Sequence, residues 1–172
     1  MKHRRGSTGG RFPRDWSVFV GLLQRHRVRF LIVGAHALAA LGRPRYTEDL
    51  DIFVEPTRKN AVRICAALRD FGFGVYADVD YFAEPGEDLQ GIQLGIEPLR
   101  IDVIKSLPGV SFAEAWRGSV RTSIDGHRVR AIGRKAFLKN KRAAGRAKDL
   151  SDIGLLEEIG VHPRGTSRRR RR

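Results

Sequence analysis

Two aspartates have the spacing of a site that binds metal and phosphate. Asp49 and Asp51 are separated by one leucine at the start of an apolar run, LDIFV. Side chains at i and i+2 of a strand lie on the same face, so we expect the two carboxylates side by side. Carboxylates this close repel one another unless a cation lies between them, and Mg²⁺ prefers such oxygen ligands. The spacing therefore predicts a site for Mg²⁺ or Mn²⁺.

Asp102 is a third candidate ligand, within the apolar run LRIDVI. A carboxylate in such a run is costly to bury without a partner. If its strand neighbours the strand of Asp49 and Asp51, the three acids form one site able to hold two metal ions. The alternative is a solvated edge strand whose acids have no function, because short patterns such as Asp-Leu-Asp are common by chance.

A glycine upstream of these acids favours the functional interpretation. Gly34 follows the apolar run RFLIV and precedes HALAAL, so a strand should end here and a helix begin. Glycine lets backbone approach a ligand closely, and a helix N-terminus offers free N–H groups to phosphate. Gly34 and Ala35 are therefore the predicted phosphate-binding turn.

Together these residues resemble the signature of the nucleotidyltransferase superfamily. That signature is an apolar residue, Gly and Gly/Ser, a spacer of roughly nine to thirteen residues, and Asp, apolar, Asp/Glu, apolar. Residues 36–48 supply thirteen spacer residues, and Asp102 lies on a later strand, where the family places its third acid. The resemblance implies an α/β (α+β) fold of the DNA polymerase beta type, with a mixed central sheet flanked by helices and followed by C-terminal helices.

The segment 138–153 adds a second likeness. It resembles the C-terminal helices of small bacterial and archaeal nucleotidyltransferases, the abortive-infection type toxins among them. On one continuous helical path Lys141, Gly145, Lys148 and Asp152 fall on a single stripe, and Arg146 and Asp149 lie close to it. The cations would neutralise a triphosphate and the acids would orient them by pairing; these residues are Lys141, Arg146 and Lys148 with Asp149 and Asp152. An ordinary surface helix with ion pairs is the alternative.

The resemblance implies transfer of a nucleoside monophosphate from an NTP, ATP among the candidates, to an acceptor hydroxyl. Asp49, Asp51 and Asp102 would be both catalytic and metal-binding. The acceptor would be an RNA 3′ end such as that of tRNA, a protein or a small molecule, in a toxin–antitoxin or phage-defence setting. Ala35 stands where the family usually has Gly or Ser and lacks the serine hydroxyl. The alternative is therefore a catalytically degenerate module that binds RNA or a partner protein.

The pattern of apolar residues predicts the elements that position this site. Alternation and helical spacing indicate strands at 29–33, 50–54, 75–79, 92–96 and 99–104. Expected helices cover 14–27, 34–41, 57–71, 112–116, 134–144 and 147–159. A polar turn region is expected at 84–91 and a hairpin turn at Asp125-Gly126.

Charge and composition bound the class of protein. The chain has 172 residues with 33 Lys+Arg against 19 Asp+Glu, a formal charge of +14, and one cysteine. Residues 1–14 carry +5 and residues 164–172 carry +6, so residues 15–163 form the predicted domain with only +3. Both ends are predicted to be flexible basic tails that contact nucleic acid or only solubilise. A lone cysteine, no secretory signal and no membrane-spanning apolar run favour a cytoplasmic protein.

Overall fold

Six strands form one mixed sheet in the order β3-β4-β2-β1-β6-β5. The computed structural model describes residues 14–158. The central pair β2/β4 is parallel, as is β1/β6, and the pairs β1/β2, β3/β4 and β5/β6 are antiparallel. The strand bounds are β1 (Phe30–Ile32), β2 (Asp49–Val54), β3 (Gln90–Leu94), β4 (Arg100–Ser106), β5 (Val120–Ile124) and β6 (His127–Ala131). The predicted α/β class with a mixed central sheet is confirmed.

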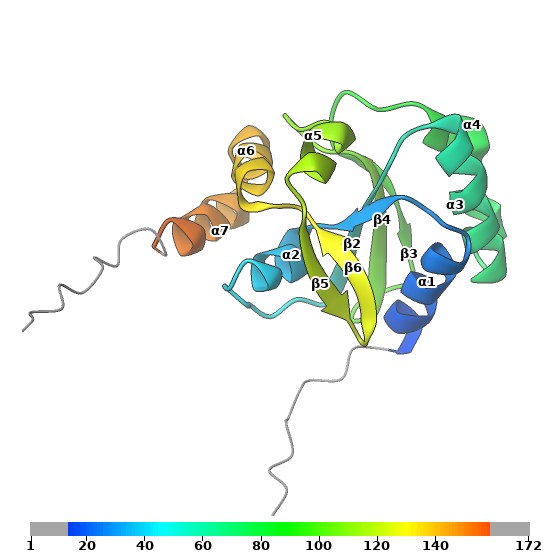
Figure 1. Ribbon diagram of the computed structural model, residues 1–172, viewed down its shortest axis with the longest axis horizontal. Coiled ribbons are helices and arrows are strands. Elements are labelled where there is room, and N and C mark those ends of the chain that lie inside the picture. Colours follow the sequence, from blue (N-terminus) through cyan, green and yellow to red (C-terminus); the bar gives the residue numbers. More distant parts are fainter. Residues whose placement is uncertain (1–13, 159–172) are drawn as a thin grey trace, which may run out of the picture.

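Helices flank this sheet on both sides. Figure 1 shows α1, α3 and α4 gathered on one side of the strands and α6 and α7 on the other. The helices are α1 (Arg14–Arg25), α2 (Gly34–Ala40), α3 (Arg58–Asp70), α4 (Val79–Ala83), α5 (Phe112–Arg117), α6 (Arg134–Ala144) and α7 (Ala147–Glu157), with a 3₁₀ turn at Gly74–Tyr76. The bounds of α6 and α7 agree with the two predicted C-terminal helices.

Alternation along β2 separates the core from the site. Leu50, Ile52 and Val54 are fully buried, whereas Asp49 and Asp51 point to the opposite face and are only partly buried. Phe53 shares the face of the aspartates and packs edge-on against Phe112 of α5, with ring centroids 5.1 Å apart. The apolar half of the strand therefore anchors it in the core and leaves the acid pair at the end where β2 begins.

The structure corrects two predicted strands. Residues 75–79 do not form a strand, because the side chain of Asp78 accepts hydrogen bonds from the backbone N–H groups of Asp80 and Tyr81 and starts α4. The strand expected at 92–96 lies two residues earlier, at Gln90–Leu94, and thus takes the end of the predicted polar turn. Gly95, with φ of 74°, turns the chain directly after it.

The predicted basic tails, 1–14 and 164–172, lie outside the described residues except for Arg14, which begins α1. Within residues 14–158, no helix has the length and apolar character needed to cross a membrane.

Candidate active site

The register between β2 and β4 brings the three predicted acids together. Asp51 lies directly opposite Asp102, and Asp49 lies opposite Arg100, two residues earlier on both strands. Paired residues of neighbouring strands point to the same face, so all four side chains meet on one side of the sheet. The adjacency expected between Asp102 and the other two aspartates is confirmed.

Arg100 is the residue of this group that the sequence analysis missed. Its Nη2 lies 2.8 Å from Oδ2 of Asp49, and its Nε lies 3.2 Å from Oδ1 of Asp102. A third ion pair joins Nη1 to Oε1 of Glu97 at 3.1 Å. One guanidinium thus contacts two of the three acids and supplies positive charge inside the cluster. The i, i+2 rule that predicted the acid pair also places Arg100 beside Asp102, so the signal was present in the sequence.

The acids remain short of positive charge despite Arg100. Burial, followed by the charge of Asp49, raises the pKa of Asp51 above its ordinary value. Burial and then the charge of Asp51 raise the pKa of Asp102 to about 6, against the pull of Arg100. Oδ1 of Asp49 is buried and has no hydrogen-bond partner among residues 14–158. A cluster of this kind favours protons or further cations.

The turn between β1 and α2 packs directly against this cluster. Gly34 has φ of 62°, and the N–H of Val33 donates to the backbone oxygen of Asp51 over 3.0 Å. A Cβ atom at Gly34 would collide with the carboxylate of Asp51, so only glycine fits this position. The predicted phosphate turn therefore lies against Asp51, and Ala35, buried at the start of α2, follows it.

A second cluster lies where α6 meets α7. Nζ of Lys141 is 2.7 Å from Oδ1 of Asp149 and 3.1 Å from Oδ2 of Asp152, and all three residues are buried. Nε of Arg146 lies 2.7 Å from Oδ2 of Asp149, and Nε of Arg45 lies 2.8 Å from Oδ1 of Asp152. The predicted pairing of these acids with cations is confirmed.

The continuous helical stripe predicted through this segment is wrong. Gly145 adopts a left-handed conformation, with φ of 64°, and ends α6 before α7 begins at Ala147. This break folds the two helices against each other and lets Lys141 reach Asp149 across the turn. Burial opposes ionisation of Asp149, but hydrogen bonds from Arg146 and Lys141 outweigh it and lower its pKa to about 2.

One cleft of about 830 Å³ connects both clusters. All eight residues proposed from the sequence line it, namely Gly34, Ala35, Asp49, Asp51, Asp102, Lys141, Arg146 and Lys148. Lys148 is exposed and has no ion pair within residues 14–158, yet its charge still acts on Asp51. The lining also includes Ile92 and Gln93 of β3, together with Tyr76 and Leu89.

The donor set suits a divalent cation, but Arg100 competes for it. No group of three or more acid, histidine or cysteine side chains in the described part of the chain is arranged to hold a metal ion as it stands. The carboxylates are nonetheless hard oxygen donors at adjacent register positions, and burial together with neighbouring negative charge raises the pKa values of Asp51 and Asp102, which a bound cation would offset. The three aspartates therefore provide the oxygen ligands and the negative charge that Mg²⁺ or Mn²⁺ requires.

Comparison with solved structures identifies the architecture. The solution structure of the antibiotic-resistance factor ANT(2'')-Ia matches with a TM-score of 0.53 at 14% identity, over 84% of this chain and 82% of that one. The chain has the nucleotidyltransferase fold. Lower TM-scores come from the protein TM1012 of Thermotoga maritima (0.49, 10% identity, 89% of this chain and 98% of that one) and from the lincosamide antibiotic adenylyltransferase LnuA bound to lincomycin (0.48, 13% identity, 87% and 98%). By sequence, neither a family model nor a curated protein matches.

The nucleotidyltransferase fold explains the order of the site along the chain. The glycine turn after β1, the acid pair on β2 and the third acid on β4 come from separate segments that the sheet brings together. Two pairs of sheet neighbours, β1/β2 and β2/β4, are therefore sufficient to assemble the acidic side of the cleft.

Proposed function

We propose that this protein transfers a nucleoside monophosphate from an NTP to an acceptor hydroxyl with release of pyrophosphate. The observation that carries the proposal is the register of β2 and β4, which sets Asp51 opposite Asp102 and Asp49 two residues away on the same face. The acids lie in a cleft large enough for a nucleotide, and the lining of the same cleft includes Lys141, Arg146 and Lys148. Acids and cations in one cleft are the set of groups that a metal-bound triphosphate requires.

Asp49, Asp51 and Asp102 would hold Mg²⁺ or Mn²⁺, which would supply positive charge to the triphosphate and polarise the reacting phosphoryl group. Asp102 has a further role that its surroundings support. Burial raises its pKa to about 6, close to the range in which a carboxylate takes up a proton effectively at neutral pH. Asp102 is therefore the candidate to accept the proton of the acceptor hydroxyl.

The cations of the cleft differ in how free they are to bind phosphate. Lys141 is buried and contacts two carboxylates, so its charge is already compensated. Arg146 contacts Asp149 but is half exposed, at 50%. Lys148 is exposed and without an ion pair in the described chain, which makes it the leading phosphate-binding residue of α7. The N–H groups of the Gly34–Ala35 turn would bind phosphate from the opposite side, beside Asp51.

The acceptor is an RNA 3′ end such as that of tRNA, a protein hydroxyl or a small molecule. The structural neighbour ANT(2'')-Ia is an antibiotic-resistance factor. This supports including small molecules among the candidate acceptors. A toxin–antitoxin or phage-defence setting belongs to the same proposal. Incubation with acceptors of each class separates these choices.

The deciding experiment is transfer of label from each α-³²P-labelled NTP, ATP included, with Mg²⁺ or Mn²⁺, total RNA and cell lysate. Label should enter one acceptor class with the wild type and not with the Asp49→Ala/Asp51→Ala variant. Glu48→Ala is the matched control, because Glu48 precedes the acid pair but does not line the cleft. Absence of transfer with every nucleotide, from folded protein, would overturn the proposal.

A nucleotide-binding module without catalysis is a second candidate, favoured by the contacts of Arg100 with Asp49 and Asp102. If Arg100 permanently replaces the metal, NTP should bind equally well with and without Mg²⁺. Calorimetric titration with a non-hydrolysable ATP analogue tests this. Tighter binding with Mg²⁺ favours the enzyme, and equal binding favours the module.

A further inference from the structure

A basic surface lies on the other half of the sheet from the acid cluster, on the hairpin of β5 and β6 and the helix ends beside it. We call it the hairpin arginine surface. It consists of Arg117 at the end of α5, Arg121 on β5, Arg128 and Arg130 on β6, and Arg134 and Lys135 at the start of α6. The sequence analysis did not single out any of these residues.

Strand register and a close backbone contact bring these cations together. Arg121 lies directly opposite Arg130, and Ser123 lies opposite Arg128. Residues two apart on a strand share a face, so the three arginines point to the same side of the hairpin. The backbones of Gly118 and Gly133 touch so closely that a Cβ at Gly133 would collide with the Gly118 carbonyl oxygen. This contact brings the chain positions of Arg117 and Arg134, which directly precede and follow these glycines, close to one another beside the hairpin.

The charge of this surface is not balanced from within the described chain. Arg117, Arg121, Arg128, Arg134 and Lys135 are exposed, and residues 14–158 provide no ion pair to any of them. The nearby acid Glu114 pairs with Lys139, and Glu55 pairs with Arg29. Asp125, in the turn between β5 and β6, forms no ion pair within residues 14–158, so the arginines of the hairpin are not neutralised by it.

Arg130 is held in place rather than left mobile. Its guanidinium lies 5.0 Å from the ring centre of Trp116, and the guanidinium of Arg29 lies 4.6 Å from the same ring. Nη1 of Arg130 also donates to the hydroxyl of Ser119 over 3.0 Å. Stacking on an indole fixes a cation in position without neutralising it. Like charges directly opposite on a hairpin, as in Arg121 and Arg130, destabilise the fold, so this arrangement is better explained by a ligand than by stability.

We propose that the hairpin arginine surface binds the phosphate backbone of a single-stranded nucleic acid. Arginine forks match phosphate oxygens in pairs, and cations repeated along a strand suit an anion with a repeated charge. A compact anion would need convergent cations, whereas these run from α5 through the hairpin to α6. The surface is separate from the nucleotide cleft, whose lining contains none of its six residues. The proposal is therefore independent of the proposed transferase activity.

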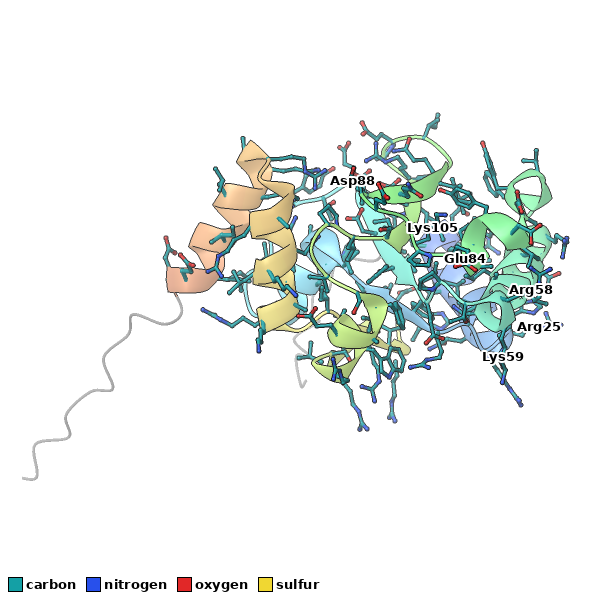
Figure 2. The ribbon with its side chains drawn as sticks, turned by 90° about the horizontal axis from the view of Figure 1, so that it is seen from above. Arg25, Arg58, Lys59, Glu84, Asp88 and Lys105 are labelled. Atoms are coloured by element: carbon teal, nitrogen blue, oxygen red, sulfur yellow. The ribbon has the colours of Figure 1, made fainter. Side chains whose placement is uncertain are left out.

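The test measures binding of a fluorescent 20-nucleotide single-stranded RNA, and the matching DNA, to the full-length protein over a range of salt. The test variant is Arg121→Glu/Arg128→Glu. The matched control is Lys59→Glu/Arg69→Glu, which changes the net charge equally. Lys59 and Arg69 are exposed residues of α3 without ion pairs in the described residues, and Figure 2 shows Lys59 at the end of the molecule away from α6 and α7.

The test variant should bind RNA about tenfold more weakly than the control, and its log–log salt slope should be smaller by about 1.4, or 0.7 for each lost phosphate contact. Equal loss in both variants would show that net charge alone governs binding and would overturn the proposal, as would no loss in either. Equal effects on RNA and DNA support backbone recognition, whereas an effect on RNA alone adds recognition of the ribose. Circular dichroism should show both variants folded, because the glutamate that replaces Arg121 would face Arg130 with opposite charge.

Discussion

Two clusters of acids lie at the same cleft, one lining it and the other behind its cations, and the pKa values of Asp102 and Asp149 are shifted in opposite directions. On β2 and β4, one arginine contacts two of three aspartates, and the pKa values of Asp51 and Asp102 are raised. At the junction of α6 and α7, two aspartates receive Lys141, Arg146 and Arg45, and the pKa of Asp149 falls to about 2.

The difference separates acids that are paired with cations inside the fold from acids whose negative charge is only partly compensated. Asp149 and Asp152 are buried with their cations already in contact, so their charge contributes to tertiary structure. Asp49, Asp51 and Asp102 are kept close together at a cost in electrostatic energy. Perturbed acids in a cleft are candidates for function because the fold alone gains nothing from them. Aspartates beside one cleft thus occupy two different electrostatic environments.

Substitution of one acid in the β2/β4 cluster should reduce activity without loss of stability, whereas substitution in the α6–α7 cluster should reduce stability. The largest expected effect is on the rate of nucleotidyl transfer. We expect Asp51→Asn to lower the transfer rate about a thousandfold or more, since several kcal/mol of charge stabilisation at the phosphoryl group would disappear. Its melting temperature should be unchanged or higher, because a partly buried carboxylate without an ion pair in the described chain is removed. Radiolabel transfer and calorimetry measure the two quantities. A large loss of stability would place Asp51 with the structural acids.

Asp149→Asn should instead destabilise the protein. Removing one partner of a buried ion pair leaves Lys141 and Arg146 with less negative charge, at a cost of about 3–5 kcal/mol in the free energy of unfolding. Urea denaturation measures this loss. Asp70→Asn is a suitable control, because its partner His26 is at the surface and the expected change is small. If both variants unfold at the same urea concentration, the α6–α7 cluster is not structural.

The dependence of stability on pH should differ in sign between the clusters. The pKa of Asp102 is raised from 3.8 to about 6, so the folded state binds a proton that the unfolded state releases. Asp102 should therefore lower the free energy of unfolding as pH rises from about 4 to 7, by about 2–3 kcal/mol. Comparing wild type with Asp102→Asn across this range isolates the contribution.

Asp149 gives the opposite dependence at lower pH. Its pKa is depressed to about 2, so its contribution is complete above pH 4 and is lost as pH falls through 2. The Asp149→Asn variant should lack this acid transition. Parallel curves for the wild type and both variants would contradict the assignment of opposite environments.

The smallest effect concerns Arg100. The guanidinium of Arg100 contacts Asp49 and Asp102 and would repel a metal ion at these carboxylates. We therefore expect Arg100→Gln to bind Mn²⁺ about fivefold more tightly than the wild type in the absence of nucleotide, because this repulsion, screened as charges near a protein surface are, is removed. Electron paramagnetic resonance titration measures the affinity directly. Arg58→Gln, which removes an exposed pair with Asp80, should leave it unchanged. Weaker binding by Arg100→Gln would mean that the arginine organises the acids instead of competing for them.

Local rules predicted much of the fold and the candidate site. Alternation placed Asp49 and Asp51 on one face, helical spacing gave α6 its observed bounds, and Gly34 was correctly placed between a strand and a helix. These features depend on neighbouring residues alone. Even the missed contact of Arg100 with the acids follows the same i, i+2 rule.

Long-range and competing local signals explain the errors. The pairing of Arg45 with Asp152 spans 107 residues, so no local pattern contains it. Residues 75–79 alternate like a strand, but capping by Asp78 favours a helical turn. The helical stripe failed because Gly145 is compatible with a helix by spacing yet adopts a left-handed conformation that ends it.

The absence of a side chain at residue 34 has a consequence for sequence comparison. Any Cβ there would occupy the space of the Asp51 carboxylate, so a side chain at residue 34 is incompatible with this carboxylate in its present position. A homologous chain that carries alanine or serine at this position would have to move or shorten its acid. A residue other than glycine at position 34 is therefore a one-letter sign that a chain with this architecture has a different arrangement of acids on β2 and β4.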